Sequence, residues 1–127
     1  MRVAASLIAL AMVLPGAESP YLKVHQKAED GIIHLSAENV SDKPIVAYVV
    51  AVERKTDSGK ATIVHSGVYT GEDQFAAQGT VSLGTLDTRS SSAAPSVIVD
   101  YVRLSDGTVW GDAVTEQGKE VAARFKK

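Results

Sequence analysis

The sequence contains no cysteine, and this absence removes several kinds of chemistry at once. Without thiols there are no disulfides, no thiolate nucleophile, no cysteine metal ligand and no lipid-modified N-terminal cysteine. Methionine is also scarce, because the two copies, Met1 and Met12, both lie in the first apolar segment. The rest of the chain therefore lacks the soft sulfur ligands that cuprous and blue-copper sites need.

The chain also lacks a strong charge of either sign. It carries 13 lysines and arginines against 15 aspartates and glutamates, with a net charge of −2, and the two signs are interspersed. Nothing in this pattern resembles the basic patch of a nucleic-acid-binding protein. No phosphate-cradling glycine loop and no dinucleotide fingerprint occurs either. We therefore predict no nucleic-acid partner and no cofactor.

The first residues have the pattern of a secretory signal peptide. Arg2 supplies one positive charge, and the apolar run that follows ends at Pro15-Gly16-Ala17. That run is shorter than the roughly 20 apolar residues that a membrane-spanning helix needs. We expect residues 1–17 to be removed, leaving a periplasmic or secreted protein with no stable membrane insertion.

Residues 18–127 are predicted to form a single domain of short strands. Apolar or alternating runs follow one another, separated by turn signals, which is typical of an all-β sandwich. In one of these runs Ile33, Leu35 and Ala37 alternate with polar residues, so they should face the core. The predicted strands span Tyr21–Ala28, Ile32–Asn39, Ile45–Arg54, Ala61–Val68, Thr80–Leu86, Val97–Leu104 and Thr108–Trp110.

The segment 45–52 differs from the other runs because both of its faces are apolar. Such a strand needs a cover on each side. An apolar stripe at helical spacing near the end of the chain predicts a helix at about 112–125, which we expect to supply one cover. Asp112 is its predicted N-cap, and Gly118 in mid-helix predicts close contact between helix and sheet. The stripe consists of Val114, Gly118, Val121 and Phe125.

The residues around the only tryptophan are explained mainly by the turn and the bend that they form in the fold. Ser105-Asp106-Gly107 separates two apolar runs, and an Asp-Gly pair in this position is a strong hairpin signal because the turn requires positive φ. Trp110 then falls on a short final strand, and Gly111 allows the chain to bend toward the helix.

Two stretches resemble a known kind of domain. Glu38-Asn39-Val40-Ser41-Asp42-Lys43-Pro44-Ile45 resembles the passage between the B and C strands of small bacterial immunoglobulin-like domains. With Val99–Gly111, the chain is similar to uncharacterised exported bacterial proteins of that type. The resemblance implies a mainly β fold: an antiparallel immunoglobulin-like β-sandwich of about seven strands, here with an added C-terminal α-helix. It implies no catalytic residues.

Three aromatic residues are the candidate ligand-binding side chains. Tyr69, Phe75 and Trp110 lie in or near predicted loops, where exposed rings could serve as platforms for a peptide or a glycan. The alternative is burial: Trp110 would then belong to the core, and Phe75 would seal one end of the sandwich.

A metal site is a second hypothesis, based on His25 and His34. If the first hairpin turns on Asp30-Gly31 alone, the two imidazoles share one sheet face as diagonal neighbours, roughly 7 Å apart. A turn of three residues would shift the register and place them on opposite faces. Two imidazoles are fewer than the three or four protein ligands of a typical zinc site. Exposed strand histidines are the simpler interpretation.

Carboxylates offer the remaining chemistry. Asp100 stands out because apolar residues flank it, and we expect it to point outward beside Arg103 or Arg54 as a structural ion pair. A catalytic use of Asp100 or Asp112 would need a second carboxylate at glycosidase separation, and no spacing in the sequence identifies such a pair.

The functional expectation follows by elimination. The leading hypothesis is an exported, non-enzymatic interaction module that binds a protein or a glycan of the cell envelope or the extracellular space, through a sheet edge or loops. One alternative is a small hydrolase, or an accessory domain of one, that uses surface carboxylates. The second alternative is metal binding through His25 and His34.

Overall fold

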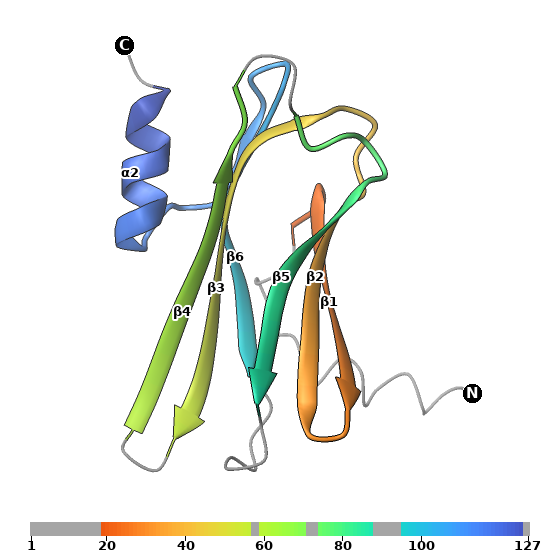
Figure 1. The fold of residues 1–127 in the computed structure, drawn as a ribbon. Helices are drawn as coiled ribbons and strands as arrows, with labels where there is room; N and C mark the ends of the chain where they lie inside the picture. Colours follow the sequence, from red (N-terminus) through yellow and green to blue (C-terminus); the bar gives the residue numbers. More distant parts are fainter. Residues whose placement is uncertain (1–18, 57–58, 71–73, 88–94, 126–127) are drawn as a thin grey trace, which may run out of the picture.

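The computed structural model describes residues 19–56, 59–70, 74–87 and 95–125. The predicted signal peptide, residues 1–17, lies outside this part of the chain. The described residues are mainly β, in two antiparallel sheets with one short C-terminal helix (Figure 1). Within them, no helix combines the length and the apolar character that crossing a membrane requires.

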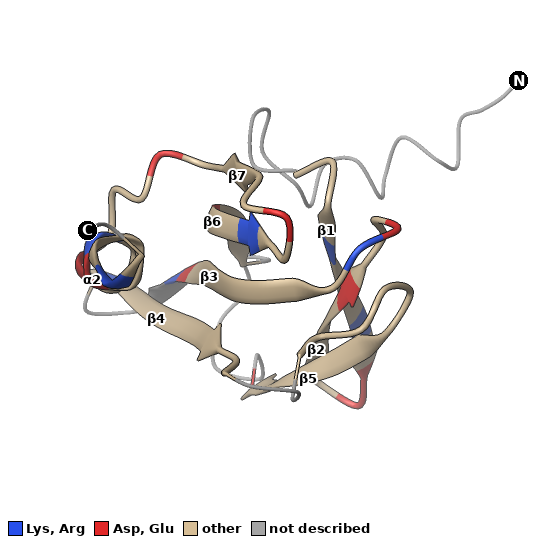
Figure 2. Ribbon diagram, turned by 90° about the horizontal axis from the view of Figure 1, so that it is seen from above, with Lys and Arg blue, Asp and Glu red and all other residues tan. Residues whose placement is uncertain are grey.

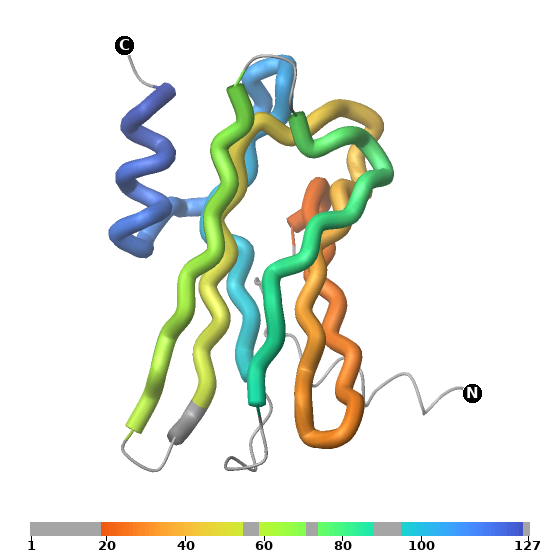
Figure 3. Tube along the Cα trace, viewed as in Figure 1, coloured from red at the N-terminus to blue at the C-terminus, as the bar shows by residue number. Residues whose placement is uncertain are grey.

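The two sheets differ in size. The three-stranded sheet has the order β1-β2-β5, and the four-stranded sheet has the order β4-β3-β6-β7. Figure 3 traces the chain as it leaves the first hairpin and crosses to the other sheet at β3. The strands are β1 (Leu22–Glu29), β2 (Ile32–Asn39), β3 (Ile45–Thr56), β4 (Gly59–Val68), β5 (Thr80–Asp87), β6 (Ser96–Leu104) and β7 (Val109–Trp110), and the helix is α2 (Glu116–Arg124).

The main core draws its side chains from both sheets. Leu35 of β2, Val50 of β3 and Val102 of β6 all belong to one buried cluster, and each is at most 2% exposed. Ile33, Leu35 and Ala37 are buried, as their alternation in the sequence predicts. The outward residues between them are polar, so the two-residue period of the strand places the apolar set on the core side.

The first hairpin has the tighter of the two turns considered from the sequence. Asp30 and Gly31 have φ angles of 54° and 79°, and Glu29 pairs directly with Ile32. Positive φ at both turn residues matches the right-handed twist of the strands. His25 consequently pairs with Ser36, the register that brings His25 and His34 to one face.

The prediction that the helix covers the doubly apolar strand is confirmed. Ala47 and Val49 of β3 form a second buried cluster with Tyr101 of β6 and Val121 of α2. Viewed from above, α2 lies on the side of the four-stranded sheet that faces away from the three-stranded sheet (Figure 2). Val50 points to the main core and Val49 to the helix, so both faces of β3 are buried, as its sequence requires.

The predicted start of the helix is wrong. α2 begins at Glu116 and its N-cap is Thr115, whose hydroxyl accepts a hydrogen bond from the backbone N–H of Gly118. Asp112 is instead an exposed residue of the connection from β7. Ala113, next to it, has a φ of 52°, which no residue of a right-handed helix adopts, so the helix cannot begin at Asp112.

Candidate functional site

The most distinctive local feature is an irregularity in β6. Val49 of β3 pairs with Tyr101 and the next residue, Val50, pairs with Val99, so Asp100 is an extra residue in β6. A bulge of this kind bends a strand and redirects a side chain. Here it places Asp100 on the side of the sheet that α2 covers, where the residue is only 2% exposed.

Asp100 binds the connection to the helix. Its Oδ1 accepts from the backbone N–H of Val114 at 2.8 Å, and its Oδ2 accepts from the backbone N–H of Thr115 at 3.0 Å and from the Thr115 hydroxyl at 2.6 Å. The prediction of an outward Asp100 beside Arg103 or Arg54 is therefore wrong. The bulge turns the carboxylate inward, and the N–H groups preceding the helix replace the arginines as partners.

Two glycines allow this close approach. A Cβ on Gly118 would collide with the Asp100 carboxylate, and a Cβ on Gly111 would collide with the backbone carbonyl of Asp100. Gly111 also has a φ of 106°, a conformation that favours glycine. The predicted close contact at Gly118 is confirmed, although its partner is a carboxylate and not an apolar side chain.

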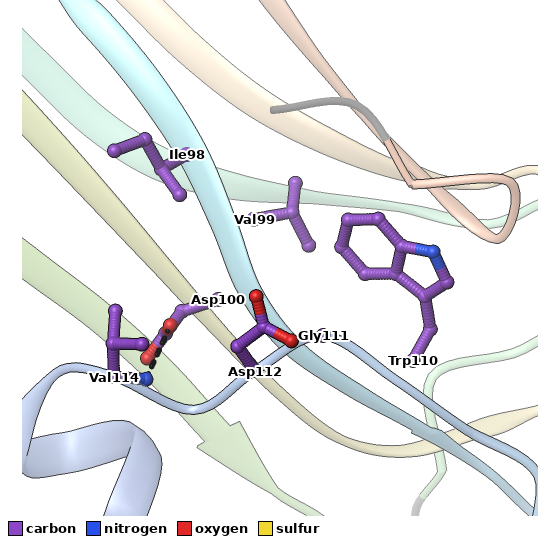
Figure 4. Close-up of a pocket in the computed structure, with 7 residues that line it drawn as sticks. All are labelled: Ile98, Val99, Asp100, Trp110, Gly111, Asp112 and Val114. Carbon is purple, nitrogen blue, oxygen red and sulfur yellow. Dashed lines mark hydrogen bonds between the residues drawn. The ribbon is translucent and has the colours of Figure 1, made fainter. Parts of the chain in front are cut away.

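A cavity of about 250 Å³ lies beside this arrangement (Figure 4). We call it the Asp112 cavity; it is lined by Ile98, Val99, Asp100, Trp110, Gly111, Asp112 and Val114. Its lining combines two carboxylates, one indole ring and aliphatic side chains, with no lysine or arginine. Ile98 is 37% exposed and Val114 is 65% exposed, so apolar surface remains open at its rim.

The cavity adjoins an unpaired strand edge. β7 pairs with β6 only at Val102 and Arg103, and the carbonyl of Asp100 accepts from the N–H of Ala113. Along Ser96–Val99, none of the strands in the described ranges pairs with the side of β6 that faces away from β3. We call this segment the open edge of β6.

The open edge of β6 lacks the lysines and bulges found at the edges formed by β1 and β5; the edge of β4 is likewise uncharged and regular over Ala61–Val68, after Lys60. Lysines and bulges on edge strands prevent unwanted pairing. β1 carries Lys23 and Lys27, β4 carries Lys60, and β5 is interrupted by an irregularity next to Gly84, whose φ is 95°. Ser96–Val99 contains no charge and no irregularity until Asp100. This edge is therefore suited to pairing with another strand.

The three candidate aromatic residues do not form one surface. Trp110 is partly buried and lines the Asp112 cavity. Phe75 is only 3% exposed and packs against Tyr48 and Tyr69, with ring centroids 6.0 and 6.3 Å away. Phe75 is thus no exposed platform, because its N–H and C=O bridge to Ile45 and fix its ring in the core. Tyr69 is half-buried against the same core.

Tyr48 contributes the third ring of this aromatic cluster. Burial, together with the neighbouring Tyr69 and a hydrogen bond to its side chain, raises the pKa of Tyr48 to about 12. Its ring lies across Gly67 of β4, where a Cβ would come within 2.6 Å of Cε2. The phenol is therefore a packed structural group, held neutral at physiological pH.

The two histidines share a face, and each lies beside a glutamate. His25 Nε2 is 2.9 Å from Glu38 Oε1, and His34 Nε2 is 3.9 Å from Glu29 Oε1. Within the described ranges, no three histidine, cysteine or acidic side chains gather in a way that would hold a metal ion. The histidine face thus presents two exposed contacts between an imidazole and a carboxylate.

Asn39, at the end of β2, begins an Asn-x-Ser sequence, the acceptor pattern for N-linked glycans, but its side chain has a structural role. The side chain is fully buried: Nδ2 donates to the carbonyls of Lys43 and Phe75, and Oδ1 accepts from the N–H and hydroxyl of Ser41. All four hydrogen-bonding positions of the amide are occupied. A glycan on Asn39 is incompatible with this packing.

Comparison with known proteins gives no relative: no family model, no curated protein and no solved structure matches the chain. The candidate site is therefore assigned from the geometry of this structure alone. Sequence reasoning found Trp110 and singled out Asp100 but missed the open edge. The uncharged run Ser96–Val99 beside a β7 of only two residues was the available signal.

Proposed function

We propose that this protein is an exported, non-enzymatic interaction module that binds an extended segment of another protein by adding it as a strand to the open edge of β6. The observation that carries the proposal is the unprotected edge at Ser96–Val99, next to a cavity with exposed apolar side chains. In strand addition, main-chain hydrogen bonds supply affinity, and pockets for alternate side chains supply specificity. The open edge would supply the main-chain hydrogen bonds, and the Asp112 cavity would supply a pocket for one side chain.

The strand order supports a more specific fold assignment within the proposal. In an immunoglobulin-like sandwich the first, second and fifth strands share one sheet, and the third, sixth and seventh strands share the other. The orders β1-β2-β5 and β4-β3-β6-β7 agree with that scheme for these six strands, whereas β4 pairs with β3 and not with β5, where the seven-strand scheme places the fourth strand. The last strand of such a domain normally covers the sixth along its length, whereas β7 has two residues here. The incoming segment would take the place of the missing part.

The carboxylates of the cavity favour binding over hydrolysis. A glycosidase needs two carboxyl groups that are free to act on the substrate, one as an acid and one as a base or nucleophile. Asp100 is 2% exposed, and both of its oxygens accept hydrogen bonds from Val114 or Thr115. Only Asp112 remains available, and one carboxylate does not make this catalytic pair.

A peptide also fits the site better than a glycan. Glycan-binding sites commonly present the open face of an aromatic ring, and Phe75 is buried while Trp110 is partly covered by the core. The exposed side chains at the rim are aliphatic, namely Ile98 and Val114. Aliphatic side chains beside free backbone groups suit an extended polypeptide.

Selection from a displayed random-peptide library tests the proposal. The purified protein should enrich short sequences of β-branched and apolar residues that bind the wild type and lose binding to Ile98→Lys, because an edge lysine opposes strand pairing. The matched control is Ile63→Lys on β4, which replaces a similarly exposed isoleucine, at 42% against 37% for Ile98, and changes the net charge in the same way. Peptides that bind both variants equally, or no enrichment, would overturn the proposal.

A further inference from the structure

The Asp112 cavity is acidic, and strand addition by itself does not require an acidic cavity. Its lining contains Asp100 and Asp112 and no basic residue. Asp100 is satisfied by three donors, whereas Asp112 is exposed and makes no ion pair with any described residue. The negative charge of Asp112 is therefore available to a ligand.

The indole beside it suits the same kind of ligand. Trp110, the last residue of β7, lines the cavity together with Asp112, which follows two residues later, and Figure 4 shows both side chains. Although the core covers part of the Trp110 ring, the part that lines the cavity can attract a cation, and the carboxylate of Asp112 adds a direct ion pair. Aliphatic Ile98 and Val114 at the rim can pack against the methylene stem of a long basic side chain.

We infer that the segment bound at the open edge of β6 carries a lysine or arginine whose side chain enters the Asp112 cavity. This inference rests on the proposed function and names the chemistry of its partner. Charge complementarity between the cavity and the basic side chain selects the segment, and the strand pairing holds it.

A set of peptides that differ at one position separates the two proposals. A peptide enriched by the wild-type protein is made with lysine, with norleucine and with glutamate at the position that faces the cavity. The lysine form should bind about fivefold more tightly than the norleucine form, the upper range for an accessible ion pair, and the glutamate form more weakly than both. Asp112→Asn should reduce the difference, because the Trp110 ring remains, and Asp112→Lys should reverse the order.

The control for net charge is Asp42→Lys, because Asp42 is highly exposed and does not line the cavity. This variant should keep the wild-type order. Equal binding of the lysine and norleucine forms, with sensitivity to Ile98→Lys retained, would overturn the basic-residue inference and leave strand addition in place. Binding that is insensitive to Ile98→Lys would overturn strand addition itself.

Discussion

The hydroxyl of Thr115 lies 2.6 Å from Oδ2 of Asp100 and, at the same time, accepts the backbone N–H of Gly118 at 2.8 Å. One side chain thus caps α2 and connects its first turn to the bulge in β6. Since Asp100 and Asp112 line the same cavity, the structure that fixes the helix also shapes the candidate binding site.

Asp100→Asn should destabilise the protein. An amide has a single oxygen, so it cannot accept from Val114 and Thr115 through two oxygens, and one of these part-buried hydrogen bonds is lost. We expect the free energy of unfolding to fall by about 2 kcal/mol in urea titrations. Asp42→Asn, at an exposed position, should change it by less than about 0.5 kcal/mol. Equal stability of Asp100→Asn and wild type would show that the Asp100 hydrogen bonds contribute nothing.

Gly118→Ala should also destabilise the protein, although alanine is normally favoured over glycine in a helix. In an exposed helix interior, alanine is favoured over glycine by about 1 kcal/mol. At Gly118 the added Cβ collides with the Asp100 carboxylate, so unfolding should occur at a lower urea concentration than in the wild type. Lys119→Ala, one residue later on the exposed side, serves as the control and should be near neutral. A stabilised Gly118→Ala protein would disprove the close contact.

Asn39→Ala should be among the most damaging polar substitutions. It removes the amide that binds Ser41, Lys43 and Phe75, and it leaves a cavity and unpaired buried groups. We expect a loss of about 2 to 4 kcal/mol in the free energy of unfolding. Val40→Ala, at the exposed neighbour, is the comparison and should cost far less. Similar losses for the two variants would contradict the network.

The stability of the protein should fall at high pH because of Tyr48. Its pKa is raised to about 12 in the folded state, whereas an unfolded tyrosine ionises near pH 10. The folded state therefore favours the neutral phenol: this contribution is complete below about pH 10 and is lost as the pH rises toward 12. Urea titrations across this range should show a steeper decline for the wild type than for Tyr48→Phe. Parallel declines would place the phenol outside the core.

Much of the fold follows from local patterns. The alternation in Ile32–Asn39, the Asp-Gly turns and the stripe through Gly118 each depend on neighbours in sequence, so strands, hairpins and helix cover were predictable. The bulge at Asp100 was not, because it arises where β6 must match β3 and meet the connection to α2. The N-cap was misplaced for the same reason: Asp112 and Thr115 are both suitable capping residues, and Asp100 decides between them.

The candidate site was predictable only in part. Trp110 was found because it is the only tryptophan, but the burial of Phe75 depends on its bridge to Ile45, far away in sequence. The uncharged run Ser96–Val99 and the short last strand were local signals of the open edge of β6, but they do not show which side of β6 lacks a partner. Knowledge of the strand order was needed to recognise it.

The most direct test of the account is the measurement of backbone nuclear Overhauser effects between the protein and a peptide enriched from the display library. We predict contacts between the peptide backbone and Ser96–Val99 in the pattern of paired strands, with slower exchange of amides along that segment. Contacts that fall instead on the outer face of the three-stranded sheet or on α2, with the β6 amides unchanged, would contradict the assignment of the open edge as the binding site.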